Sequence, residues 1–178
     1  TLERNKIEIW WHIRNEEILE SMETEGRNAK YLSDIEFDTS LITATSDINE
    51  VVRNCEVILI AAPSAFLAYI LAELDEPLDN KFILSATKGI IEEEYRTITE
   101  YFKNKYGLHY TNLGLISGPS HAEEVSRDKL SYLTVACKSE ENAKLIGEMF
   151  KSKDLKVAHS QDIYGIEYAA ILKNIYAL

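Results

Sequence analysis

The chain has 178 residues, of which 46% are hydrophobic and 28% are charged. This composition is typical of a folded globular protein, and the length suits one domain with at most a small appendage. With 30 acidic and 19 basic residues, the formal net charge is −11. Such a charge argues against binding nucleic acid or an anionic membrane surface. No apolar stretch approaches the roughly 20 residues that a membrane-spanning helix needs, so we expect no membrane insertion.

The cysteines and the two chain ends bear on the cellular compartment. Cys55 and Cys137 lie in apolar runs, where a buried reduced thiol is expected rather than a disulfide or a metal ligand. The first residues do not read as a signal peptide. The sequence therefore predicts a cytoplasmic protein without a metal site. Because it starts at Thr1 without a methionine and stops inside a helical pattern, we expect both ends to be cut.

Short apolar runs alternate with amphipathic segments along the chain. The predicted strands are 6–13, 57–62, 81–86, 113–116, 131–137 and 156–159. The predicted helices are 15–25, 65–74, 91–106, 140–151 and 162–178. The run at 57–62 is continuously apolar, as expected of a parallel strand buried on both faces. The alternation predicts an α/β fold with a doubly wound, mostly parallel sheet of the Rossmann-like type.

In such sheets ligands bind just beyond the carboxyl ends of the strands. Four predicted strand ends carry unusual residues, at 12–15, 62–64, 87–89 and 117–125, and three of the four can offer hydrogen-bond donors or positive charge to an anion. In the third of these, Lys88 leaves the end of a buried run and Gly89 allows backbone and ligand to approach closely. A phosphate could bind there, although a solvated lysine in an ordinary strand-to-helix turn stays open.

The segment after the strand at 113–116 reads Ser117-Gly118-Pro119-Ser120. It combines a turn, a helix-initiating proline and Ser120 as a candidate N-cap. Backbone amides and a hydroxyl at a helix start can bind an anion. The residue types alone equally allow a capped turn that binds nothing.

The last segment, 162–178, is apolar almost all round, which predicts a buried helix or one packed between domains. Its strongly polar interior residues are Glu167, Lys173 and Asn174. Helical spacing places Lys173 on one side with small residues such as Ala169 and Ala170. We expect its ammonium to be partly desolvated, which lowers the pKa of a lysine toward values useful for proton exchange. A lysine whose head simply reaches water is the alternative.

Four motifs together resemble the bacterial NAD(P)-dependent glycerol-3-phosphate dehydrogenases. They are SGPSHAEEV, ATKG, the APS after a buried strand, and GIEYAAILKNIYAL, and the resemblance covers the chain from about residue 6 to its end. It implies an enzyme that interconverts dihydroxyacetone phosphate and sn-glycerol 3-phosphate for phospholipid synthesis. It also implies a cofactor-binding domain at 1–160, followed at 161–178 by the first helix of a helical substrate domain that is otherwise missing.

The resemblance assigns roles to individual residues. Lys173 matches the lysine that exchanges the proton at the C2 oxygen, and Asn174 matches the asparagine beside it. Lys88 matches a lysine shared between substrate and cofactor. Substrate contacts fall on Gly118 and Ser120. Hydride transfer to a ketone builds negative charge on oxygen, so a nearby ammonium suits this chemistry.

Further matches of the resemblance concern the dinucleotide, and they fall on Arg14, Asn15, Tyr31, Pro63, Ser64 and Ala122. An arginine after the second strand can hold the 2′-phosphate of NADP, whereas an acidic residue there usually marks NAD. Arg14 therefore favours NADP without excluding NAD. A plain surface charge after a strand is the alternative reading of Arg14.

The sequence departs from the family pattern in two respects, because both the first strand with its glycine turn and most of the helical substrate domain are missing. It contains no Gly-x-Gly-x-x-Gly, the turn that cradles the pyrophosphate, so we expect this fragment alone to be inactive and assign the function to the parent enzyme. A related reductase of the 6-phosphogluconate or ketopantoate type and a non-catalytic nucleotide-binding module remain alternatives. A homodimer of the full-length enzyme is left open.

Overall fold

The structure, a computed structural model, describes residues 1–92 and 94–176, with residues 174–176 described by their backbone alone. Its strands are β1 (Ile9–His12), β2 (Ile42–Thr45), β3 (Val57–Ile60), β4 (Phe82–Ser85), β5 (Ile90–Ile91), β6 (Arg96–Thr97), β7 (Leu113–Ser117), β8 (Ser131–Cys137) and β9 (Leu155–Ser160). Its α-helices are α1 (Glu16–Glu25), α2 (Ile48–Asn54), α3 (Ser64–Ile70), α4 (Ile98–Tyr106), α5 (Ala122–Ser126), α6 (Glu140–Phe150) and α7 (Ile163–Tyr176). Short 3-10 turns are η1 (Glu3–Asn5), η2 (Thr39–Leu41), η3 (Leu71–Glu73) and η4 (Tyr110–Asn112).

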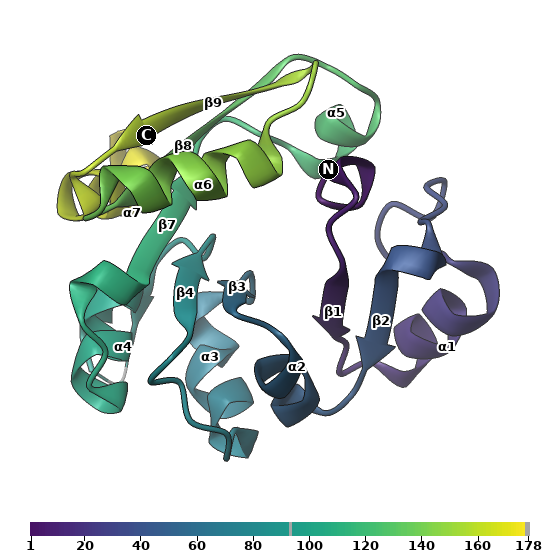
Figure 1. The fold of residues 1–178 in the computed structure, drawn as a ribbon, viewed down its shortest axis with the longest axis horizontal. Coiled ribbons are helices and arrows are strands. Elements are labelled where there is room, and N and C mark those ends of the chain that lie inside the picture. The colour runs from purple at the N-terminus through teal and green to yellow at the C-terminus, as the bar shows by residue number, and fades with distance from the viewer. Residues whose placement is uncertain (93, 177–178) are drawn as a thin grey trace.

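The main sheet has five strands in the order β3-β4-β7-β8-β9. Its pairs are parallel except β7 with β8, which is antiparallel. A separate parallel pair joins β1 to β2, and Figure 1 shows this pair with α1, set apart from β3 and β4. In the described part of the chain, β1 pairs only with β2 and β3 only with β4. The predicted α/β fold with a mostly parallel sheet is confirmed.

Helices pack on both faces of the main sheet, as the doubly wound prediction requires. Successive residues of a strand point to opposite faces, and β7 shows the division. Its Leu113 joins the core cluster that includes side chains of α3 and α4, and its Leu115 packs with α7. Its Ile116 joins the cluster around α6 on the opposite face. Each such side chain that is fully buried stabilises the fold by about 1.5–3 kcal/mol.

The predicted helix at 91–106 is wrong over its first residues. Ile90–Ile91 and Arg96–Thr97 instead form a short antiparallel pair, and α4 begins only at Ile98. The start is fixed by a capping box, in which the Thr97 hydroxyl accepts from the backbone N–H of Glu100 and the Glu100 carboxylate accepts from that of Thr97. Such reciprocal bonds satisfy backbone donors that have no partner within the helix. This hairpin lies directly after Lys88.

The sequence reading also passed over β2 and α2. The strand Ile42–Thr45 has only four residues, with a burial pattern that leaves one of them exposed. The helix Ile48–Asn54 has an Asp47 N-cap, whose carboxylate accepts from the backbone N–H of Asn49 at 2.8 Å. Both elements are too short to give a clear periodic signal.

Candidate functional site

A pocket of about 300 Å³ opens where β4 and β7 reach their carboxyl ends and α7 passes over them. Thr134 of β8 reaches the same pocket, because it pairs with Ser117 across the antiparallel β7–β8 ladder. The lining residues are Lys88, Ser117, Gly118, Pro119, Thr134, Ile166, Ala169, Ala170 and Lys173. The pocket thus joins two strand ends of the sheet to one side of the last helix.

Lys88 and Lys173 are the cationic side chains of this pocket, and they lie against each other. Burial lowers the pKa of Lys88, and the nearby charge of Lys173 lowers it further. Among the described residues, no carboxylate lies within ion-pairing distance of either ammonium. Two ammonium groups that share a pocket without a counter-charge make it attractive to an anion.

The predicted desolvation of Lys173 is wrong for this structure, since its side chain is exposed. Helix α7 packs on the sheet through Ile163 and Ile166, which contact the cluster around Leu115 and Ala136. Lys173 lies beyond these contacts, near the end of the described helix. The Lys88 side chain is exposed as well, and the burial of its remaining part lowers its pKa.

Two loops that follow β3 and β4 are held together next to Lys88. The hydroxyl of Thr87 donates to the backbone carbonyl of Ala62 at 2.7 Å. Gly89 has φ +124°, and a Cβ at this position would lie 2.6 Å from the Oγ of Ser64. Only glycine allows that close approach. The predicted contacts Pro63 and Ser64 are thereby placed beside the turn that carries Lys88.

Gly118 also occupies a position that a side chain cannot share. Its φ is +152°, and a Cβ would lie 2.3 Å from the backbone oxygen of Tyr132 in β8. Its backbone lines the pocket, whereas Ser120 is not among the lining residues. The backbone N–H of Ser120 donates to the carbonyl of Gly118 at 3.1 Å. The pocket thus brings Lys88 and Gly118 together, and Ser120 follows Gly118 by two residues.

The predicted capping role of Ser120 is wrong. The residue at the N-cap of α5 is His121, which makes no side-chain capping bond, and Ala122 is the first helical residue. Because α5 has only five residues, it offers little of the aligned backbone dipole that an anion seat needs. The exposed Ala122 keeps its predicted cofactor role as a proposal.

The residues predicted to contact the adenosine side follow β1. The Arg14 guanidinium carbon lies 4.7 Å from the ring centroid of Tyr69 in α3, a cation–π geometry that places Arg14 near the segment after β3. Asn15 caps α1, because its side-chain oxygen accepts from the backbone N–H of Ile18 at 3.0 Å. Tyr31 is 69% exposed. The side chain of Asn174 lies outside the described residues.

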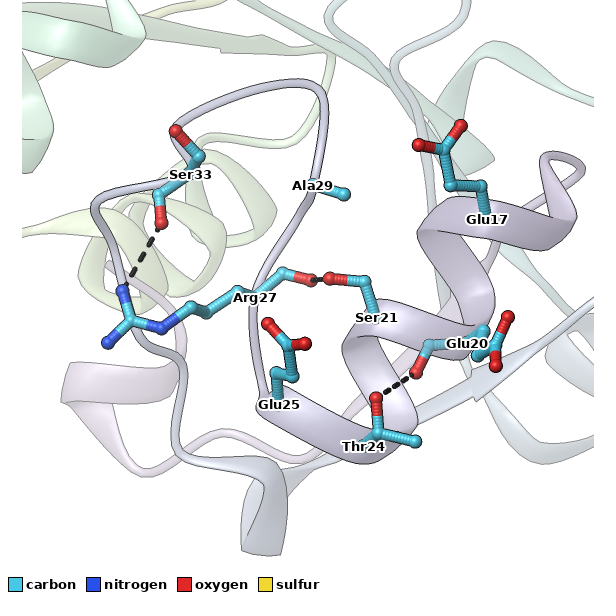
Figure 2. Close-up of a pocket in the computed structure, with 8 residues that line it drawn as sticks. All are labelled: Glu17, Glu20, Ser21, Thr24, Glu25, Arg27, Ala29 and Ser33. Carbon is cyan, nitrogen blue, oxygen red and sulfur yellow. Dashed lines mark hydrogen bonds between the residues drawn. The ribbon is translucent and has the colours of Figure 1, made fainter.

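A second pocket, larger than the two-lysine pocket, lies beside α1 (Figure 2). It measures about 440 Å³, and Glu17, Glu20 and Glu25 are among its lining residues. Its Arg27 is already engaged, by an ion pair with Glu36 at 2.8 Å and a hydrogen bond to a backbone carbonyl. An acidic hollow without a free cation does not suit a phosphorylated substrate, so we assign the site to the two-lysine pocket.

Sequence reasoning missed Thr134 and Tyr69. Thr134 is brought to the pocket by the antiparallel pairing of β8, which the strand pattern did not reveal. Tyr69 is an exposed aromatic residue of α3, and only its contact with Arg14 distinguishes it.

No group of residues in the described ranges could hold a metal ion. No described helix is long and apolar enough to cross a membrane.

Comparison with known families decides the relationship. The family model described as the NAD-dependent glycerol-3-phosphate dehydrogenase N-terminus matches residues 1–143. The chain belongs to this family. The resemblance drawn from the sequence motifs is therefore confirmed at the level of the family.

Named relatives agree with this membership. A glycerol-3-phosphate dehydrogenase [NAD(P)+] of Staphylococcus haemolyticus is 32% identical over 167 residues, which cover 93% of this chain and 50% of the relative. Its counterpart in Oceanobacillus iheyensis is 33% identical over 175 residues, covering 98% of this chain and 50% of that protein. The chain thus spans about half the length of these relatives.

Solved structures support the fold. Glycerol-3-phosphate dehydrogenase from Coxiella burnetii superposes with a TM-score of 0.85 at 24% identity, covering 99% of this chain and 53% of that one. The Plasmodium falciparum enzyme gives 0.84 at 20% identity, covering 94% and 48%. A GDP-mannose dehydrogenase gives a lower score of 0.67 at 10% identity. The family match and the named relatives, rather than the fold, disfavour the other dehydrogenase groups considered from the sequence.

Proposed function

We propose that the full-length protein that carries this chain interconverts dihydroxyacetone phosphate and sn-glycerol 3-phosphate with NAD(P)H. The observation that carries the proposal is the meeting of Lys88 and Lys173 on one pocket at the carboxyl ends of β4 and β7. The substrate has a phosphate that needs cations and a ketone that needs an acid. The pocket offers two ammonium groups, and family membership supplies the reaction class.

Each lysine takes one part of the reaction. When bound, the reduced nicotinamide supplies the hydride, because no side chain can donate one. The Lys173 ammonium would give its proton to the C2 oxygen of the ketone as negative charge develops there. Lys88 binds the substrate and orients it toward the cofactor, while the backbone at Gly118 shapes the wall of the pocket. We keep Ser120 as a substrate contact and Asn174 as a partner of Lys173.

The dinucleotide would lie along the strand ends that precede this pocket. Arg14, Asn15 and Tyr31 would contact the adenosine side, and Pro63, Ser64 and Ala122 would contact the rest of the cofactor. The position of Arg14 supports this fit. Arg14 follows β1, and its exposed guanidinium lies over the ring of Tyr69 in α3. Arginine at such a strand end suits the 2′-phosphate of NADP, so we propose a preference for NADP over NAD.

The wider setting of the chain is proposed from the family. Residues 1–160 form the cofactor-binding domain, and α7 begins the helical substrate domain. The site takes a small phosphorylated substrate, and the enzyme acts in the cytoplasm, where its product supplies the backbone of glycerophospholipids. A homodimer is the expected form of the full-length enzyme.

The test is an activity assay of the full-length enzyme with dihydroxyacetone phosphate, read by the loss of the absorbance of the reduced nicotinamide. We expect turnover with this substrate and little with ketopantoate, and in the reverse direction oxidation of glycerol 3-phosphate and little of 6-phosphogluconate. Turnover of one of the two hydroxy-acid substrates alone would establish the alternative enzyme class. Tight dinucleotide binding without turnover of any of the four would establish a binding module and refute the proposal.

A further inference from the structure

Glu167 is a buried carboxylate on α7, six residues before Lys173. It is 5% exposed, and burying a charge is costly unless its oxygens are partnered. One carboxylate oxygen accepts from the backbone N–H of Thr99 at 3.0 Å, and the other accepts from the Thr99 hydroxyl at 2.5 Å. Both partners thus belong to one residue in the first turn of α4, where the helix dipole favours a negative charge.

This contact joins the two segments that carry the lysines. On one side, the chain runs from Lys88 into β5, which pairs with β6, and β6 leads directly into α4. Ile90 lies opposite Thr97, two residues before Thr99. On the other side, six residues of helix separate Glu167 from Lys173, a rise of about 9 Å. The Glu167 carboxylate therefore links α4, which follows the turn that carries Lys88, to α7, which carries Lys173.

The contacts of α7 with the core of the sheet are apolar, while outside that core Tyr164 packs edge-to-face on Tyr110 and lies under the Lys138 ammonium. Ile163 and Ile166 pack with Leu115 and Ala136, and hydrophobic contacts are non-directional. They favour burial of this side of α7 without fixing how far the helix is turned or shifted along its axis. Two hydrogen bonds from one carboxylate to a backbone N–H and a hydroxyl have defined directions and distances. They are suited to fixing the register of the helix.

We propose that Glu167 is a positioning residue, which fixes α7 against α4 through Thr99 and so holds the Lys173 ammonium at the pocket beside Lys88. The proposal rests on the function proposed above for the two lysines. Glu167 does not line the pocket, so it acts through Lys173 rather than on the substrate. A shift of the helix by a fraction of its pitch would move the ammonium away from the C2 oxygen.

The experiment uses the full-length enzyme with Thr99→Val, which removes the hydroxyl at nearly constant volume and leaves the backbone N–H. Thr99→Ser restores the hydroxyl, and Thr99→Ala is the second deletion variant should valine prevent folding. Glu167→Gln keeps an acceptor for the N–H and a donor for the hydroxyl. Glu141→Gln, at an exposed position of α6, is the matched control.

Two readouts are measured on each variant. The first is the steady-state kcat and the KM for dihydroxyacetone phosphate. The second is the pH dependence of Lys88 acetylation, followed by mass spectrometry, which reports the proximity of Lys173 without requiring turnover. Because Lys173 helps to lower the pKa of Lys88, moving it away should shift the labelling midpoint of Lys88 to higher pH.

We expect Thr99→Val and Thr99→Ala to reduce kcat by about 10-fold to 100-fold, the scale of a misplacement near 1 Å. The labelling midpoint should rise in the same variants. Thr99→Ser and Glu167→Gln should restore or retain both properties, and Glu141→Gln should match the wild type. Deletion variants that melt at lower temperature but keep the wild-type kcat and labelling midpoint would show a merely structural contact and overturn the proposal.

The two proposals fail in different ways. If the wild-type enzyme does not reduce dihydroxyacetone phosphate but the labelling midpoint still follows the Thr99 hydroxyl, the function is wrong and the positioning role stands. If the wild-type enzyme is active but neither readout follows the hydroxyl, the function stands and the positioning role of Glu167 is wrong.

Discussion

Replacing Lys173 by methionine in the full-length enzyme tests the division of labour between the two lysines. Methionine keeps most of the bulk of the stem and removes the charge and the proton. Lys173 is exposed and lines the pocket without contributing to the described core clusters. We therefore expect Lys173→Met to fold and to bind the dinucleotide with nearly wild-type affinity.

The loss should fall on the chemical step. Removing a general acid together with its electrostatic assistance should reduce turnover by roughly 10²-fold to 10⁴-fold. Single-turnover kinetics with dihydroxyacetone phosphate measures this step directly. Lys156→Met, at an exposed position of β9, is the control for loss of a lysine away from the pocket.

The same variant should change the titration of its neighbour. Of the causes that lower the pKa of Lys88, burial would remain, while the charge of Lys173 would be lost. The pKa of Lys88 should then rise toward its ordinary value of 10.5. Since the pH dependence of kcat/KM reports the free enzyme, its alkaline limb should move to higher pH. Near-normal single-turnover rates with an unmoved limb would refute the two-lysine mechanism.

Three further outcomes follow from the geometry. Arg14→Asp should weaken NADPH binding by about 1–3 kcal/mol more than NADH binding, as measured by titration calorimetry, and equal losses would contradict the cofactor proposal. Gly118→Ala should lower the free energy of unfolding in urea by about 2–4 kcal/mol, because its Cβ would lie 2.3 Å from the Tyr132 backbone oxygen. Unchanged stability would show that β8 moves to accept the methyl group. Lys88→Met should abolish substrate saturation. Because the folded state holds the Lys88 proton less tightly than the unfolded state, and solvent screens this exposed side chain, the variant should also raise Tm slightly at neutral pH. A clearly lower Tm would contradict this sign.

The sign of the Lys88 effect follows from its lowered pKa. Below the folded pKa both states carry the proton, and the full cost of holding a charged lysine in this position is present. As pH rises from the folded pKa toward 10.5, the folded state releases the proton first and stability increases. At pH 7 the native lysine therefore lowers stability, which Lys88→Met removes. The binding role proposed for Lys88 would therefore come at a small cost in stability, a common pattern at functional sites.

Much of the fold could be predicted because the main strands are continuous apolar runs. The segments around Val57–Ile60 and Phe82–Ser85 were placed within a residue or two of their observed ends. The hairpin after Lys88 could not be predicted, because a two-residue strand shows no hydrophobic periodicity and the apolar residues at 90 and 91 fit a helix equally well. There the capping box at Thr97 was the local signal that marked the true helix start.

The candidate site could likewise be predicted from the sequence only in part. Lys88 and Gly118 follow strands directly, so the rule that ligands bind beyond strand ends made them candidates, and the family resemblance gave them their expected roles. The small-residue side of α7 was also readable, because Ile166, Ala169 and Ala170 line the pocket with Lys173 as their helical spacing predicts. Exposure of Lys173 was not readable, because helical periodicity shows which residues share a side but not what covers that side.

Glu167 shows what a sequence can and cannot say about such a helix. It was visible as a charged residue in an apolar segment, and a buried charge always needs a partner. Its partner, Thr99, is 68 residues away and belongs to a helix whose start the sequence reading misplaced. Only the fold brings them together, through the hairpin that follows Lys88. The distance between the two lysines is therefore set by a third group, and a substitution that touches neither lysine should alter the chemistry they perform.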